Sequence, residues 1–160
     1  MKLLHLFLLI FLWNTTYRCK KDELTIDCAD AAKKMIGTWK GNQSNNAKTF
    51  SDAFTLKVKS SDGCRFLGET SYTQSITTYN VSGTIDEYGW MEFTETNFIV
   101  DGGEYTGCTG SGWSNPCRDI RWRPGATFNE VRFDEISLSG EWEIACWRCD
   151  LDGGFSLFKE

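Results

Sequence analysis

The chain has 160 residues, of which 14% are aromatic and 24% are charged, and its formal net charge is −5. The aromatic content excludes a disordered chain, and the lack of a fixed sequence period excludes collagen-like and coiled-coil architectures. The acidic balance argues against binding to a phosphate backbone, so we expect no nucleic-acid partner. A chain of this length can form one domain with its own hydrophobic core.

The N-terminal residues have the composition of an export signal. Lys2 is followed by an apolar stretch from Leu3 to Trp13, which only His5 interrupts. This stretch is too short to span a bilayer, and its position after a basic residue is typical of a signal peptide. We therefore predict a signal peptide over residues 1–18, a tether over 19–27 and a folded domain over 28–160. The mature protein is expected outside the cytoplasm.

Cys19 follows the predicted signal peptide and begins the sequence Cys19-Lys20-Lys21-Asp22-Glu23. This sequence resembles the start of surface-exposed lipoproteins from the Bacteroidetes group, in which lysine and acidic residues follow a lipidated cysteine. The resemblance implies lipidation of Cys19 and a lipid anchor in the outer membrane or at the cell surface. A secreted protein with an unmodified Cys19 is the alternative, because Thr16 and Arg18 stand where a lipobox prefers leucine and a small residue.

The remaining cysteines also indicate an oxidising compartment. The chain has seven cysteines, so six are left if Cys19 carries lipid, and an even set is compatible with disulfides. The disulfide candidates are Cys28, Cys64, Cys108, Cys117, Cys146 and Cys149. Their connectivity stays open at this stage, although we favour a bond from Cys108 to Cys117. We interpret Cys146 and Cys149 as structural rather than redox-active, because their motif ends a predicted strand instead of beginning a helix.

The order of predicted elements is a short helix followed by strands. Asp27 can cap a helix that ends near Lys34, and Ala29, Ala31 and Ala32 favour it. From Ala53 to Ser60 the pattern has period two, with Phe54, Leu56 and Val58 on one face. Further strands are predicted at Cys64–Tyr72, Ile76–Ile85, Trp90–Val100, Glu104–Cys108, Asp119–Arg123, Ala126–Phe133, Ile136–Trp147 and Phe155–Lys159.

These elements predict an all-β fold. We expect a single antiparallel barrel of about eight strands, preceded by a short N-terminal helix. Isolated glycines inside strand patterns favour a barrel over a sandwich, because they permit sharp bends and close backbone contacts. In the strand Ile136–Trp147, we expect Ile136, Leu138 and Trp142 on the buried face.

The segment Gly37-Thr38-Trp39 follows the predicted helix and opens the first strand. It resembles the start of the calycins, which include lipocalins, fatty-acid-binding proteins and avidins. The resemblance implies a calycin-like barrel in which Trp39 closes one end and Lys159, near the end of the last strand, packs over its ring. A strand-opening tryptophan in another β fold is the alternative.

The sequence contains few of the residue combinations that enzymes use for catalysis. His5 is the single histidine and lies in the predicted leader, so the mature chain cannot form a Ser-His-Asp or Cys-His pair or a histidine metal site. We expect no enzyme activity, no cofactor and no metal. Glu92 and Glu95 fall on opposite faces of one strand, and we interpret both as solvated charges. A carboxyl group with a raised pKa inside a cleft would contradict that interpretation.

The expected function is non-enzymatic binding. A calycin-like barrel would hold an apolar or amphipathic small molecule, with Trp90, Trp122 and Trp142 as candidate lining residues. The alternative is a filled barrel whose loops contact a surface protein or a glycan. Trp113 is the candidate contact residue in that case, because it lies between Cys108 and Cys117 in a stretch without apolar periodicity.

Overall fold

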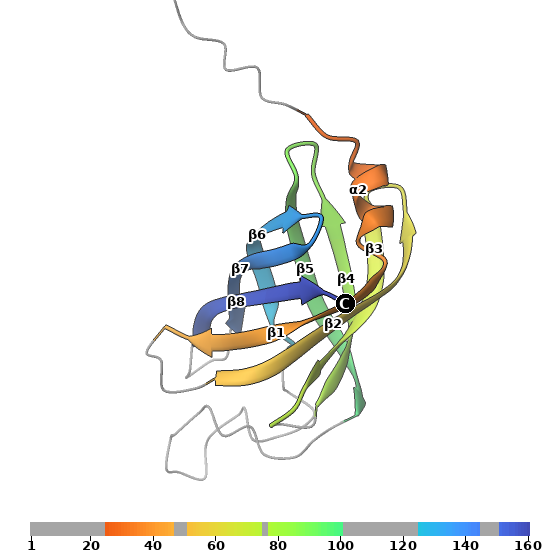
Figure 1. Cartoon of the computed structure of the whole chain (residues 1–160). Coiled ribbons are helices and arrows are strands. Elements are labelled where there is room, and N and C mark those ends of the chain that lie inside the picture. The colour runs from red at the N-terminus through yellow and green to blue at the C-terminus, as the bar shows by residue number, and fades with distance from the viewer. Residues whose placement is uncertain (1–24, 47–50, 75–76, 101–124, 145–150) are drawn as a thin grey trace, which may run out of the picture.

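A computed structural model shows eight antiparallel strands that close into one barrel (Figure 1). The structure describes residues 25–46, 51–74, 77–100, 125–144 and 151–160. The strands are β1 (Gly37–Asn45), β2 (Ser51–Asp62), β3 (Arg65–Tyr72), β4 (Thr78–Ile85), β5 (Trp90–Val100), β6 (Thr127–Asp134), β7 (Ser137–Ile144) and β8 (Leu151–Lys159). Each strand pairs with its neighbour in sequence, and β1 pairs with β8 to close the sheet. This confirms the predicted all-β barrel, while the predicted strands at 104–108 and 119–123 lie outside the described residues.

A short helix, α2 (Cys28–Lys34), precedes the barrel, as predicted. Asp27 caps it, since one carboxylate oxygen accepts hydrogen bonds from the peptide nitrogens of Ala29 at 2.9 Å and Asp30 at 3.3 Å. Ala31 and Ala32 face the barrel and are buried. In the part of the chain that the structure describes, no helix is long and apolar enough to cross a membrane.

A disulfide fixes α2 to the barrel. Cys28 at the start of the helix bonds to Cys64 in the turn between β2 and β3, with 4.9 Å between the Cα atoms. This Cα separation lies in the usual range for a disulfide. The structure thus pairs two of the predicted disulfide cysteines. The other four, Cys108, Cys117, Cys146 and Cys149, lie outside the described residues.

Side chains alternate between the interior and the outside of the barrel. In β2 the inward positions are Asp52, Phe54, Leu56 and Val58, all of them buried. Such strict alternation is the expected consequence of a pleated strand with one face on the core. The predicted inward face of β2 is therefore confirmed, and it also contains an acidic residue.

The alternation between inward and outward side chains shifts in β6. In β6 an extra residue breaks the pairing between Asn129 and Arg132, and Glu130 there has a φ of 50°. This bulge turns Glu130 outward and brings Val131 into the core. The prediction that Ile136 is buried was wrong, because β7 begins one residue later and Ile136 lies in the preceding turn, where it is 68% exposed.

The two ends of the barrel differ. At one end, which we call the helix end, α2 lies beside the short β2–β3, β4–β5 and β6–β7 turns (Figure 1). At the other, which we call the loop end, the chain leaves and re-enters the barrel in the β1–β2, β3–β4, β5–β6 and β7–β8 connections. Up-and-down topology of consecutive strands imposes this division.

The Cys28–Cys64 bond closes a segment of 36 residues, so its removal should destabilise the fold. We expect the double variant Cys28→Ala/Cys64→Ala to lose about 2–4 kcal/mol of unfolding free energy, because the unfolded chain gains conformational freedom. Chemical denaturation of both proteins under oxidising conditions measures the loss. An unchanged free energy of unfolding would contradict a stabilising role for this bond.

Candidate functional site

Aromatic rings fill the middle of the barrel. Phe93 and Phe128 stack with ring centroids 4.2 Å apart, and Phe54 stacks on Phe128 at 5.3 Å. Phe155 meets Phe128 edge-on at 5.3 Å. These rings come from strands on different sides of the barrel and pack against one another. The central layer is therefore a packed core, with the contacts that stabilise the fold.

The helix end is closed by Trp39. This residue is fully buried, and its indole nitrogen donates a hydrogen bond to the carbonyl oxygen of Met35 at 2.8 Å. The amino group of Lys159 lies 5.2 Å from the centroid of the Trp39 ring. Strand pairing places Trp39 opposite Lys159, so the first and last strands of the barrel bring the two together. The resemblance to calycins implied this arrangement.

The loop end contains polar groups inside the barrel. The buried polar or charged residues that the structure describes are Gln43, Asp52, Thr70, Thr77 and Glu95, and the hydroxyl group of the buried Tyr72 bonds to Glu95. Trp142 and Tyr79 are buried with them. A mostly apolar wall with a few polar groups is typical of a small-molecule site.

Glu95 is the most perturbed ionisable group that the structure describes. Its side chain is only 4% exposed. One carboxylate oxygen accepts hydrogen bonds from the hydroxyl groups of Thr70 and Tyr72, and the other accepts one from the peptide nitrogen of Ala126 at 2.9 Å. Burial raises the pKa of Glu95 from 4.5 to about 7, although these hydrogen bonds oppose the rise.

The interpretation of Glu95 as a solvated charge was therefore wrong. Met91 and Phe93 precede it at alternate positions and face the core, so period two already places Glu95 inside. Glu92, on the opposite face, is exposed as expected. Both oxygens of Glu95 accept hydrogen bonds from the protein, which indicates a carboxyl group held in one position.

Gln43 and Asp52 form a second polar feature at the loop end. They are 3% and 1% exposed, and they lie directly opposite each other on the paired strands β1 and β2. The peptide nitrogen of Gln74 donates to one oxygen of Asp52 at 2.8 Å. Its other oxygen, Oδ2, and Gln43 Oε1 have no hydrogen-bond partner among the described residues. Buried acceptors without a donor are rare in folded proteins.

The tryptophans that were predicted to bind a ligand do not lie at one place. Trp142 faces the interior at the loop end, where its indole nitrogen donates to the carbonyl oxygen of Ser44 at 3.2 Å. Trp90 differs from the expectation: it lies on the outer surface and is 39% exposed, because the inward position at the start of β5 belongs to Met91. Trp113, Trp122 and Cys19 lie outside the described residues.

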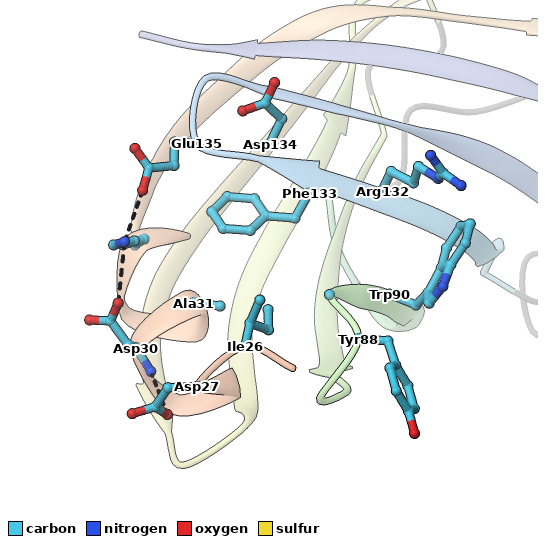
Figure 2. A pocket seen from close by; sticks show the side chains of 12 residues that line it. Ile26, Asp27, Asp30, Ala31, Tyr88, Trp90, Arg132, Phe133, Asp134 and Glu135 are labelled. Carbon is cyan, nitrogen blue, oxygen red and sulfur yellow. Dashed lines mark hydrogen bonds and ion pairs between the residues drawn. The ribbon is translucent and has the colours of Figure 1, made fainter. Parts of the chain in front are cut away.

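A hollow of about 510 Å³ lies on the outside of the barrel at the helix end (Figure 2). Trp90 stands on one side of it, with the guanidinium group of Arg132 4.6 Å from its ring centroid. On the other side, Lys34 bridges Asp30 at 3.2 Å and Glu135 at 2.8 Å. Hydrogen bonds to these carboxylates raise the pKa of Lys34, and the same contact lowers the pKa of Glu135. Lys34, Asp30 and Glu135 are thus already paired with one another.

No protein-family model matches the chain, and no curated protein matches its sequence. Among solved structures, the chain is similar to the structure of EF1p2_mFAP2b bound to DFHBI, with a TM-score of 0.54 and 8% sequence identity. The match covers 84% of this chain and 100% of that chain. At this identity the likeness concerns the fold alone, and it supports a calycin-like barrel.

Because the pKa of Glu95 is raised, we expect the free energy of unfolding to depend on pH. The folded protein keeps the Glu95 proton up to a pH of about 7, whereas the unfolded chain releases it near 4.5. The protonated Glu95 therefore contributes its full share to the free energy of unfolding below pH 4.5, and this contribution is lost as the pH rises to about 7. By linkage the loss amounts to about 3 kcal/mol.

Glu95→Gln should remove this titration. We expect the free energy of unfolding of the variant, relative to wild type, to increase by up to about 3 kcal/mol across that pH range. Urea denaturation at a series of pH values measures the difference. Glu92→Gln, on the exposed face of the same strand, is the matched control and should show no such trend. Parallel pH curves for Glu95→Gln and wild type would contradict the prediction.

Proposed function

We propose that this protein is a non-enzymatic binding protein that holds an apolar or amphipathic small molecule in the loop end of its barrel. One observation carries the proposal: buried polar and aromatic side chains gather there, and two of the polar oxygens have no partner among the described residues. The similar structure of EF1p2_mFAP2b is that of a protein bound to the small molecule DFHBI, which supports the same use of this barrel.

The interior itself limits where a ligand would lie. Trp39 and α2 close the helix end, and the phenylalanine layer fills the middle. A molecule would therefore enter from the loop end and rest against Phe54, Tyr72 and Trp142. Tyr72 would present it with an aromatic face while its hydroxyl group stays bonded to Glu95.

We further propose that the mature protein is exported and held at the outer membrane or cell surface by a lipid on Cys19, with a secreted form as the alternative. The support comes from the apolar leader and from Cys19-Lys20-Lys21-Asp22-Glu23. The Cys28–Cys64 disulfide supports an oxidising compartment, because disulfides are rare in reducing ones.

A second candidate function rests on the outside of the barrel. The hollow beside Trp90 and Tyr88 exposes aromatic surface, and the middle of the barrel is filled. These features fit a surface protein that contacts a protein or a glycan. Aromatic side chains at such surfaces carry much of the binding energy in many interfaces.

A pair of conservative variants separates the two functions. If a small molecule binds inside, Trp142→Phe should weaken the binding of an aromatic probe such as phenethyl alcohol or DFHBI by about tenfold, or 1.4 kcal/mol. Trp90→Phe, on the outer surface, should leave it unchanged. Titration calorimetry on the full chain gives both affinities. Loss of binding in Trp90→Phe alone, or no saturable binding of any probe, would contradict the interior site.

The anchor has a direct test. We expect the mature protein, purified from membranes, to begin at Cys19 and to carry added acyl mass. Mass spectrometry of the N-terminal peptide measures both properties. An unmodified N-terminus would contradict the lipid anchor but would leave the binding proposal unaffected.

A further inference from the structure

We infer that the loop end recognises a protonated amine, and that Gln43 Oε1 and Asp52 Oδ2 are the two acceptors that bind it. The inference rests on the proposed small-molecule function and names the chemical class of the ligand. Each acceptor is more than nine-tenths buried, and neither has a partner among the described residues. A ligand that binds here would donate hydrogen bonds to both oxygens.

Strand register places the two acceptors next to each other. Gln43 and Asp52 are directly paired residues of β1 and β2, and both side chains face the interior. Side chains that face each other across neighbouring strands have Cβ atoms about 4.5–5.5 Å apart. One small group between them can therefore contact both oxygens.

The carboxylate of Asp52 is held in a fixed orientation. Its Oδ1 atom accepts a hydrogen bond from the peptide nitrogen of Gln74, which follows β3. Phe54, two residues further along β2, packs against the ring of Tyr72 at 5.2 Å and limits the space on that side. The remaining oxygen, Oδ2, is left without a donor among the described residues.

The charge and the hydrogen-bond type of the site select the ligand. Two acceptors without a donor need a partner that carries at least two N–H or O–H groups. An ammonium group has three donors, no acceptor and a positive charge that matches Asp52. A carboxylate ligand would meet a like charge at Asp52, and an alcohol could donate to one of the two oxygens only. The site thus discriminates by charge as well as by hydrogen bonding.

The surrounding rings suit a cation with an aromatic or apolar body. Phe155 is paired with Gln43 across β1 and β8, and Phe54 lies beside Asp52 on the inner face of β2. The faces of aromatic rings attract cations, and the same rings bury apolar surface. An aromatic alkylamine combines both properties.

Three probes of matched size test the inference on the full chain. Phenethylamine, phenethyl alcohol and hydrocinnamate share a phenyl ring and differ in the charge of the head group. We expect calorimetry to show at least tenfold tighter binding of phenethylamine than of the other two. Asp52→Asn should reduce the affinity for the amine to that for the alcohol and leave the affinity for the alcohol unchanged. Asp62→Asn, an exposed residue on the same strand, is the matched control and should keep the preference.

A second variant tests the other acceptor, and melting temperatures show whether each variant folds. Gln43→Met keeps the length of the side chain and removes its oxygen, so we expect a weaker preference for the amine. Without a probe, Asp52→Asn and Gln43→Met should both melt at the temperature of the wild type or above it. Gln43→Met removes a buried oxygen that lacks a partner, and Asp52→Asn replaces the other unpaired oxygen by an amide group that can donate to Gln43 Oε1.

The outcomes distinguish the inference from the proposed function. Equal binding of all three probes would overturn the amine specificity and leave small-molecule binding intact, whereas binding of none would overturn both. A preference for the amine that survives Asp52→Asn and Gln43→Met would place recognition elsewhere and overturn the inference. Lower melting temperatures of both variants, together with unchanged selectivity, would show that the oxygens hold a structural water and would also overturn it.

Discussion

The pairing of β1 with β8 closes the sheet, and closure confines every second side chain to a narrow interior. A strand in an open sheet can leave an inward polar residue at an edge in contact with water, but a closed barrel has no such edge. The acidic residues at inward positions, Asp52 and Glu95, are therefore buried whatever their cost of desolvation. The polar chemistry inside this protein follows from that constraint.

The inward side chains of the closed barrel differ in kind from one end to the other. At the helix end, the capped α2 packs its buried alanines on the barrel, and the Cys28–Cys64 bond fixes this helix to the β2–β3 turn. In the middle, phenylalanine rings from β2, β5 and β6 stack on one another. Only at the loop end do buried ionisable groups occur among the described inward positions. Stability and recognition can thus be located in different parts of one small barrel.

The two buried acids are accommodated in different ways. Glu95 accepts hydrogen bonds on both oxygens from groups of β3 and from the residue before β6, so the fold itself satisfies it. Asp52 receives one hydrogen bond from Gln74, whereas its second oxygen and Oε1 of Gln43, the residue opposite it in β1, have no partner among the described residues. A satisfied carboxyl group ties strands together, whereas an unsatisfied pair costs free energy until a donor arrives. This contrast separates a structural acid from a binding group.

The sequence by itself determined the local structure of this protein: period two in β2 and the Asp27 cap follow from residue type and spacing, and the resemblance to calycins implied that Trp39 opens the first strand. The inward position of Glu95 followed from the same spacing, but the usual preference of glutamate for solvent led to the opposite interpretation. Only the tertiary structure decided which cysteine bonds to Cys28, how the bulge at Glu130 shifts β6, and that Gln43 faces Asp52. Each of these depends on the register between different strands or on the docking of α2, and local periodicity carries no information about either.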